Sequence, residues 1–231
     1  MKVCIDIDDY HSFPRYDCTD VMIKLIEKFP DIKFTVFFTP LMRNIPLADY
    51  PQALDRLREI IENGNVEVFP HGLTHRRFFR GEFGMLPGPV ARKKVERSMG
   101  LLSRARIPFR DGFKFPWNVY SRAALSVLEE LGFILFTNRI EYMFSGKQVV
   151  WDKSSGVVCR YVQTEEYRYG KPPAHGADSL IYYHGHAQNM RSNGIRESYK
   201  NFISEMKELQ GLRNLEFIFC SQLANLHSAQ V

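Results

Sequence analysis

Apolar residues follow two alternating patterns along the chain. Short runs of β-branched and aromatic residues predict strands, and between them apolar residues recur every three or four positions, which predicts amphipathic helices. The predicted strands cover residues 3–7, 33–39, 66–69, 113–115, 133–136, 180–183 and 215–219, and the predicted helices cover 21–29, 51–61, 90–106, 121–131 and 195–209. This alternation predicts one α/β domain over residues 1–231, with mostly parallel strands joined by helical crossovers.

Local signals refine this pattern at three places. Pro51 fits the first turn of its helix, and Ser121 is a suitable N-cap for the helix that Gly132 closes. Two further apolar runs, at 149–151 and 157–162, predict an extra hairpin near residues 148–162. We therefore expect an α/β core with one added hairpin.

Polar residues stand repeatedly where the predicted strands end. Asp8 and Asp9 follow the first strand, His71 follows the third, and His184 follows the strand at 180–183. The carboxyl ends of parallel strands meet on one side of a barrel or open sheet, where active sites are built. Neighbouring residues of an extended chain point in opposite directions. The first strand must therefore bend near its end if Asp8 and Asp9 are to reach one site.

A pair of histidines lies in the stretch V-F-P-H-G-L-T-H at residues 68–75. His71 and His75 can offer two imidazole nitrogens to one metal ion, provided that a carboxylate arrives from elsewhere in the fold. The alternative interpretation is one structural and one exposed histidine. The polar residues at the other strand ends favour the metal site.

Composition and charge narrow the functional classes. The chain has 231 residues, of which 45% are hydrophobic, and its 18 Phe can fill a sizeable core, so disorder is not expected. The net charge is +5, with basic clusters at residues 76–80 and 92–94. The second cluster falls on a predicted helix, where a charged face is usually solvated. Nucleic-acid binding is not expected, whereas a modestly basic groove would suit an anionic glycan.

The cysteines and the N-terminus bear on the compartment. The four cysteines show no C-x-x-C spacing, and Cys4 and Cys220 fall in apolar runs, which predicts free buried thiols and a reducing compartment. Met1-Lys2 leads directly into a strand containing Asp6, so the start does not have the pattern of a signal peptide. No apolar run has the length of a membrane span. We therefore expect a cytoplasmic protein with no membrane partner.

Five short motifs, taken in order, resemble the polysaccharide deacetylase family (NodB homology domain, carbohydrate esterase family 4). They are I-D-D at 7–9, K-F-T-V-F-F-T at 33–39, H-G-L-T-H at 71–75, F-K-F-P-W-N at 113–118 and I-Y-Y-H at 181–184. They are similar to the family's Asp-Asp motif, its following strand, its His-x-x-x-His metal motif, its Arg-x-Pro-aromatic motif and its late strand-end His. The resemblance covers residues 1–190 and implies a distorted (β/α)7 barrel that removes N- or O-acetyl groups with a divalent metal.

The resemblance also implies roles for individual residues. Asp9, His71 and His75 would bind the metal. Asp8 would be the catalytic base and His184 the acid that protonates the leaving amine. Zinc is the default metal by ligand type, with cobalt, nickel and manganese as alternatives. The implied substrate is a carbohydrate or a small acetylated compound, and the oligomeric state stays open.

The sequence departs from the family pattern in three ways. Lys114 stands where the family has Arg, so the cation that orients the base would be a point charge rather than a planar fork. The family's later Asp-rich, Trp-containing motif is not recognisable at residues 138–142. His186 follows His184 closely, so both are candidates for the acid, and the end of the apolar run favours His184.

Two further side chains are candidates for substrate contacts, and two other functions stay open. Trp117 could belong to the site wall or to the core, and Tyr10 could line a sugar site. The fold could also serve as a metal- or glycan-binding module without turnover. The run I-D-I-D-D at 5–9 could instead belong to a haloacid-dehalogenase-like phosphatase with Asp6 as the nucleophile and Asp8 as the acid. That interpretation leaves the histidines unexplained.

Overall fold

The fold is described from a computed structural model of the chain. The structure describes residues 2–76, 81–137, 161–163, 180–190, 206–207, 211 and 215–222. The strands are β1 (Lys2–Tyr10), β2 (Phe34–Phe38), β3 (Val66–Pro70), β4 (Gly112–Lys114), β5 (Ile134–Thr137), β6 (Tyr161–Gln163), β7 (Leu180–His186) and β8 (Glu216–Ile218). The α-helices are α1 (Thr19–Lys28), α2 (Pro51–Glu62), α3 (Gly88–Arg104) and α4 (Arg122–Glu130).

All pairings between the described strands are parallel. One sheet has the order β3-β2-β1-β7, with β8 also on β1, and the other has the order β4-β5-β6. β8 pairs with the first half of β1, and β2 pairs with its second half. Arg110 N–H donates to Val68 O (3.0 Å) between the chain entering β4 and β3. The fold is the predicted α/β architecture of parallel strands, a distorted (β/α)7 barrel.

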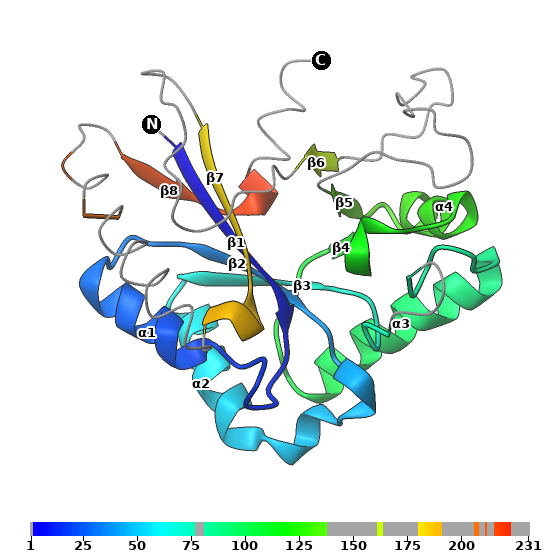
Figure 1. The fold of residues 1–231 in the computed structure, drawn as a ribbon, viewed down its shortest axis with the longest axis horizontal. Helices are drawn as coiled ribbons and strands as arrows, with labels where there is room; N and C mark the ends of the chain where they lie inside the picture. Colours follow the sequence, from blue (N-terminus) through cyan, green and yellow to red (C-terminus); the bar gives the residue numbers. More distant parts are fainter. Residues whose placement is uncertain are drawn as a thin grey trace.

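Helices flank the two sheets. In Figure 1, α1 and α2 lie beside the larger sheet, and α3 and α4 lie beside β4 and β5. Each helix turns an apolar side inward, as with Leu54, Leu57 and Ile60 of α2. The predicted cap of α4 is confirmed, since Ser121 Oγ accepts from Ala124 N–H at 3.1 Å.

Aromatic rings fill the barrel interior below the strand ends. The rings of Phe37 and Phe69 lie 5.1 and 4.6 Å from that of Phe136. Gly112 is required here because a Cβ at this position would lie 2.7 Å from the Phe69 ring. Lys114 Nζ lies 4.5 Å from the centre of the Phe37 ring. Polar groups above this layer are therefore shielded from water on their lower side.

Several local predictions can be compared with the structure. Cys4 and Cys220 are buried thiols, as predicted, with their sulfurs 3.3 Å apart. The apolar run predicts a strand that stops before His184, but β7 continues through His186 because it pairs with β1 along its length. β6, at the end of the predicted hairpin, pairs in parallel with β5. The rest of that hairpin and most of the predicted helix at 195–209 lie outside the described residues.

In the part of the chain that the structure describes, no helix combines the length and the apolar character needed to cross a bilayer.

Candidate metal and catalytic site

The carboxyl ends of β1, β3, β4 and β7 bring the predicted site residues together. Asp8 and Asp9 come from the end of β1, and His71 follows β3 directly. The pairing of β1 with β2 shifts register between Ile7 and Tyr10, and Asp9 has a positive φ of 62°. This bend is the one expected from the sequence, and it lets both carboxylates face the same site.

Asp9, His71 and His75 each offer one atom that could ligate a metal ion, and these atoms lie within 4.8 Å of one another. Asp9 Oδ1 lies 3.3 Å from His71 Nε2 and 2.7 Å from His75 Nε2. Ligands held about 2.0–2.1 Å from a tetrahedral ion are about 3.3–3.4 Å apart. The spacing to His71 matches this value, whereas the spacing to His75 is that of a hydrogen bond and would widen around a bound ion. Asp9 Oδ1 is buried, yet no described donor gives it a hydrogen bond of acceptable angle. Two imidazole nitrogens facing such an oxygen fit a divalent cation between them.

Neighbouring groups orient two of these ligands. His71 Nδ1 is 2.9 Å from Lys114 O and donates to it, so the lone pair of Nε2 is directed at Asp9. Gln188 Nε2 donates to Asp9 Oδ2 at 2.8 Å. Both contacts fix the orientation of side chains that could ligate a cation.

Glu82 organises the loop that carries the histidine pair. Its buried carboxylate accepts from the backbone N–H groups of Leu73, Thr74 and His75 at 3.1 Å each. Lys94 Nζ lies 2.9 Å from Oε1 of the same carboxylate. These bonds fix a loop in which His75 has a positive φ of 53°, a conformation that non-glycine residues rarely adopt. Glu82 therefore positions the second histidine.

Gly72 is required in the same loop. It has a φ of +67°, and a Cβ built on it would lie 2.3 Å from Pro116 Cγ and 2.6 Å from Glu82 Oε2. A larger residue would push the histidine loop away from both Pro116 and Glu82.

Replacing Glu82 by glutamine should weaken metal binding about 10- to 100-fold, the usual effect of losing a group that orients a metal ligand. The amide has one acceptor oxygen in place of two, and it turns a donor towards backbone N–H groups. Isothermal titration of metal-free protein with zinc measures the change. Glu96→Gln, on exposed α3 surface beside Arg92, is the matched control and should leave affinity unchanged. An unaltered Kd in Glu82→Gln would contradict the positioning role.

A second group, around Lys114, lies beside the metal-ligating atoms. Lys114 is fully buried, and its Nζ donates to Asp6 Oδ2 and to Asp8 Oδ1, both at 2.8 Å. Asp6 Oδ1 is 2.5 Å from His184 Nδ1. Lys114 thus holds Asp8 as the family's Arg was expected to do, but with a single nitrogen shared between two carboxylates. Asp6 in turn orients His184.

Burial and charge pairing set the protonation of these groups. Burial raises the pKa of Asp6, but His184 and Lys114 outweigh it and hold that pKa below its ordinary value. Burial lowers the pKa of His184 and of Lys114, and their carboxylate neighbours reverse this and raise both. At Asp9 and His75 burial again opposes the charged forms, but the contact between the two side chains outweighs it, so the pKa of Asp9 is lowered and that of His75 is raised. A cation bound to both side chains would displace the proton that this contact favours on His75.

The predicted substrate contacts fall into two classes. Trp117 is 49% exposed, and its ring centre lies 5.0 Å from that of His75, so it stands at the site. His186 is half-buried next to His184, with ring centres 5.1 Å apart. Tyr10 is not in contact with the site opening: it is fully buried, and its hydroxyl bonds Thr19 (2.7 Å) and Asp17 (3.1 Å). The register shift after Ile7 turns this ring into the core.

The environment of Asp6 also bears on the phosphatase alternative. A nucleophilic Asp must reach an incoming phosphate. Asp6 has no exposed surface, and both its oxygens are engaged by His184 and Lys114. The structure therefore does not support Asp6 as a nucleophile.

Sequence reasoning missed Glu82 and Gln188, and it considered Asp6 only as a phosphatase nucleophile. The contact of Asp6 with Lys114 had a signal, because Asp6 lies two residues before Asp8 and strand alternation places both on one face. Glu82 and Gln188 carry no local signal. Each acts across a loop whose path only the fold defines.

Comparisons with known proteins were made by sequence and by structure. A scan against protein-family models finds no match. A search of the curated proteins finds none either. Solved structures do match. A family 4 acetyl xylan esterase from Clostridium thermocellum, in complex with a cobalt ion, has a TM-score of 0.59 at 14% identity, and the match covers 99% of this chain and 92% of that one.

Two other matches show what the fold can accommodate. A family 4 pseudoenzyme from Bacillus anthracis has a TM-score of 0.55 at 14% identity, over 96% of this chain and 65% of its own. A 4-alpha-glucanotransferase from Thermococcus litoralis has a TM-score of 0.64 at 16% identity, over 96% of this chain and 40% of its own. Identities this low establish the fold and leave the reaction to the site. The chain has the fold of the polysaccharide deacetylases of carbohydrate esterase family 4, as its motifs predicted.

Proposed function

We propose that the protein is a metal-dependent hydrolase that removes an acetyl group, in particular an N-acetyl group, from a sugar or related carbohydrate. One observation carries the proposal. Asp8 Oδ2 lies 4.0 Å from His71 Nε2 and 4.0 Å from His184 Nε2, between the metal-ligating group and the candidate acid. A base, an acid and a cation site thus surround one small space, as hydrolysis of an acyl bond requires.

Asp9, His71 and His75 would hold the metal. A divalent cation bound there would supply Lewis-acid chemistry, polarising the acetyl carbonyl and acidifying water. Zinc suits two imidazoles and a carboxylate, and cobalt, nickel and manganese are alternatives.

Asp8 and His184 would carry the proton transfers. Asp8 accepts a proton from the attacking water, and the remaining hydroxyl adds to the acetyl carbonyl. Nε2 of protonated His184 donates a proton to the leaving nitrogen as its bond to carbon breaks, which gives acetate and a free amine. Lys114 keeps Asp8 in place throughout, and Asp6 stabilises the charged form of His184.

The acid favours an amide over an ester substrate. An amine leaves only after its nitrogen has been protonated, whereas a sugar alkoxide needs less help. The Asp6 carboxylate raises the pKa of His184, in spite of burial, so the imidazole is supplied with its proton. This suits an N-acetylated sugar.

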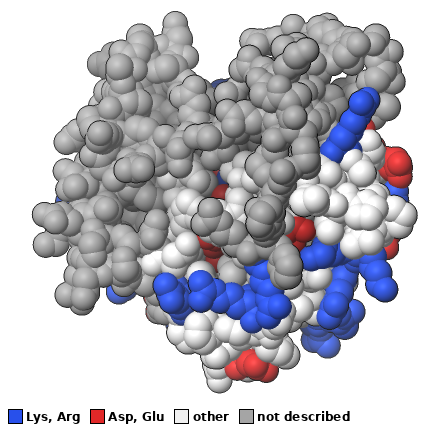
Figure 2. Space-filling view, turned by 45° about the vertical axis from the view of Figure 1, so that its right-hand side comes forward, with Lys and Arg blue, Asp and Glu red and all other residues white. Residues whose placement is uncertain are grey.

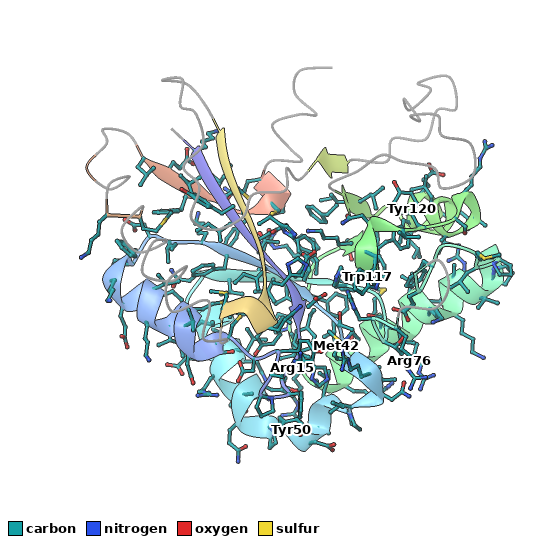
Figure 3. All side chains as sticks on the ribbon, viewed as in Figure 1. Arg15, Met42, Tyr50, Arg76, Trp117 and Tyr120 are labelled. Atoms are coloured by element: carbon teal, nitrogen blue, oxygen red, sulfur yellow. The ribbon has the colours of Figure 1, made fainter. Side chains whose placement is uncertain are left out.

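The surroundings of the site suit a polar substrate. In Figure 3, Arg15 and Met42 lie below the lower end of β1, and Trp117 and Arg76 lie to its right. Arg15 and Arg76 are exposed, and Figure 2 shows Lys and Arg side chains gathered in a band on the molecule. The flat Trp117 ring could stack on a sugar face, and the arginines could pair with acidic groups of a glycan.

Metal analysis and acetate release test the proposal together. Protein purified without chelator should contain about one divalent metal ion per chain, and its removal should abolish acetate release from an N-acetylated oligosaccharide. His71→Ala should lose both, because one of three ligands is gone, while circular dichroism reports whether the fold is kept. Metal-free wild-type protein that takes up no cation would refute the proposal. Metal uptake with no acetate released would identify a binding module instead.

A further inference from the structure

We propose that a second, weaker divalent-cation site is formed by Asp8, His184 and His186, and that its occupation inhibits the enzyme. The inhibition rests on the proposed function, whereas the binding itself does not. A cation bound by Asp9, His71 and His75 leaves the Asp8 and His184 side chains free to transfer protons. A second cation would bind both side chains and so prevent these transfers.

The backbone places the three ligands on one face. β1 and β7 pair in parallel, with Asp6 opposite His184 and Asp8 opposite His186. Because side chains alternate along a strand, His184 and His186 point to the same side of β7 as each other. One ligand atom from each of Asp8, His184 and His186 lies within 4.8 Å of the others. A cation could draw these atoms together by small side-chain rotations.

Two contacts prepare the ligand atoms. Asp6 Oδ1 accepts a hydrogen bond from His184 Nδ1, so Nε2 is the nitrogen that faces Asp8. A carboxylate on the far nitrogen is the usual partner of a metal-binding imidazole. Lys114 holds Asp8 by Oδ1, which directs Oδ2 to the space between His71 and His184. Asp8 Oδ2 is therefore placed to ligate a cation beside the first site.

Charge makes the second site the weaker one. The buried carboxylates of Asp6, Asp8 and Asp9 carry three negative charges, and the Lys114 ammonium carries one positive charge. With neutral imidazoles this leaves two negative charges, which one divalent cation neutralises, and a second cation must also displace the proton that His184 carries as the acid. A second cation enters a neutral site next to the first. We therefore expect binding in two separated steps.

The proposal predicts inhibition by excess metal. With one cation bound, Asp8 can still accept a proton and His184 can donate one. With two bound, the Asp8 oxygen and His184 Nε2 are ligands, so both proton transfers stop. Activity should rise with the first equivalent of zinc and fall as the second site fills.

Equilibrium dialysis of metal-free protein against zinc, with metal counted by mass spectrometry, tests the site directly. Wild type should bind two equivalents in two steps. His186→Ala should keep the tight step and lose the weak one, whereas the matched variant His75→Ala should weaken the tight step. His186→Gln serves as a second variant if the alanine form does not fold. Saturation of wild type at one equivalent, or an unchanged weak step in both His186 variants, would overturn the proposal.

Acetate release at rising zinc tests the inhibitory role. In wild type, the ratio of activity at one equivalent to activity at saturation of the second step should be at least about tenfold. In His186→Ala this ratio should fall to about one, whatever its absolute rate. If zinc binds in two steps and wild-type activity does not fall, the inhibitory part is wrong. If no acetate is released at one equivalent, the proposed function fails while the binding result stands.

Discussion

Replacing Asp8 by asparagine should lower the rate of acetate release about a thousandfold, within the range that general-base catalysis contributes. Asparagine has nearly the same shape, and its amide oxygen can still accept from Lys114 Nζ, which lies 2.8 Å from Asp8 Oδ1. What is lost is a group that can take a proton from water. The variant should still bind the first metal equivalent, because Asp9, His71 and His75 are unchanged.

Two further variants make this result specific. Asp6→Asn removes the neighbouring carboxylate on the same face of β1, which contacts the same lysine but also orients His184. It should alter the limb of the pH–rate profile that reports the acid, His184, whereas Asp8→Asn should lower the rate of acetate release without moving that limb. Asp31→Asn, at an exposed position, should match wild type. Acetate release at the wild-type rate in Asp8→Asn would refute the base. Loss of the first metal equivalent would make Asp8 a ligand.

The fold was predictable because its signals are local. The strand at 66–70 ends at Pro70, the helix after Pro51 carries an apolar side, and Ser121 caps α4 through its own hydroxyl. Each of these signals involves residues that are close together in the sequence. The end of β7 is not determined by a local signal. The strand continues to His186 because it pairs with β1, and no pattern in residues 180–186 reveals that pairing.

The site residues that could be predicted are those at the carboxyl ends of strands. Asp8, Asp9, His71 and His184 meet because parallel strands end on one side of the fold. The prediction that Tyr10 lines a sugar site was wrong, because the direction of its side chain depends on the bend at Asp9. That bend turns the ring into the core. Asp6 was weighed as a nucleophile, although its position two residues from Asp8 already placed both carboxylates on one face. Their shared partner, Lys114, is 106 residues from Asp8 along the chain.

Replacing Lys114 by methionine should destabilise the metal-free protein by about 3–5 kcal/mol, the usual cost of removing one partner of a buried ion pair. Methionine keeps the length of the side chain and its packing against Phe37. The loss leaves Asp6 and Asp8 buried without their ammonium partner. The free energy of unfolding in urea measures the effect. Lys94→Met is the matched control: its pair with Glu82 is as short, but it is partly exposed and Glu82 keeps other donors, so about 1 kcal/mol or less is expected.

The destabilisation should depend on pH in a defined direction. In the wild type the folded-state pKa of Asp6 lies below its ordinary value of 3.8, so Asp6 contributes stability that is present above that value and is lost as the pH falls below it. Without Lys114 the folded-state pKa rises, and protonation relieves the buried charge at higher pH. The difference between Lys114→Met and wild type should therefore be largest near neutral pH and shrink as the pH falls towards 4. A difference that stays constant between pH 7 and pH 4 would show that Lys114 stabilises the fold by packing rather than by charge.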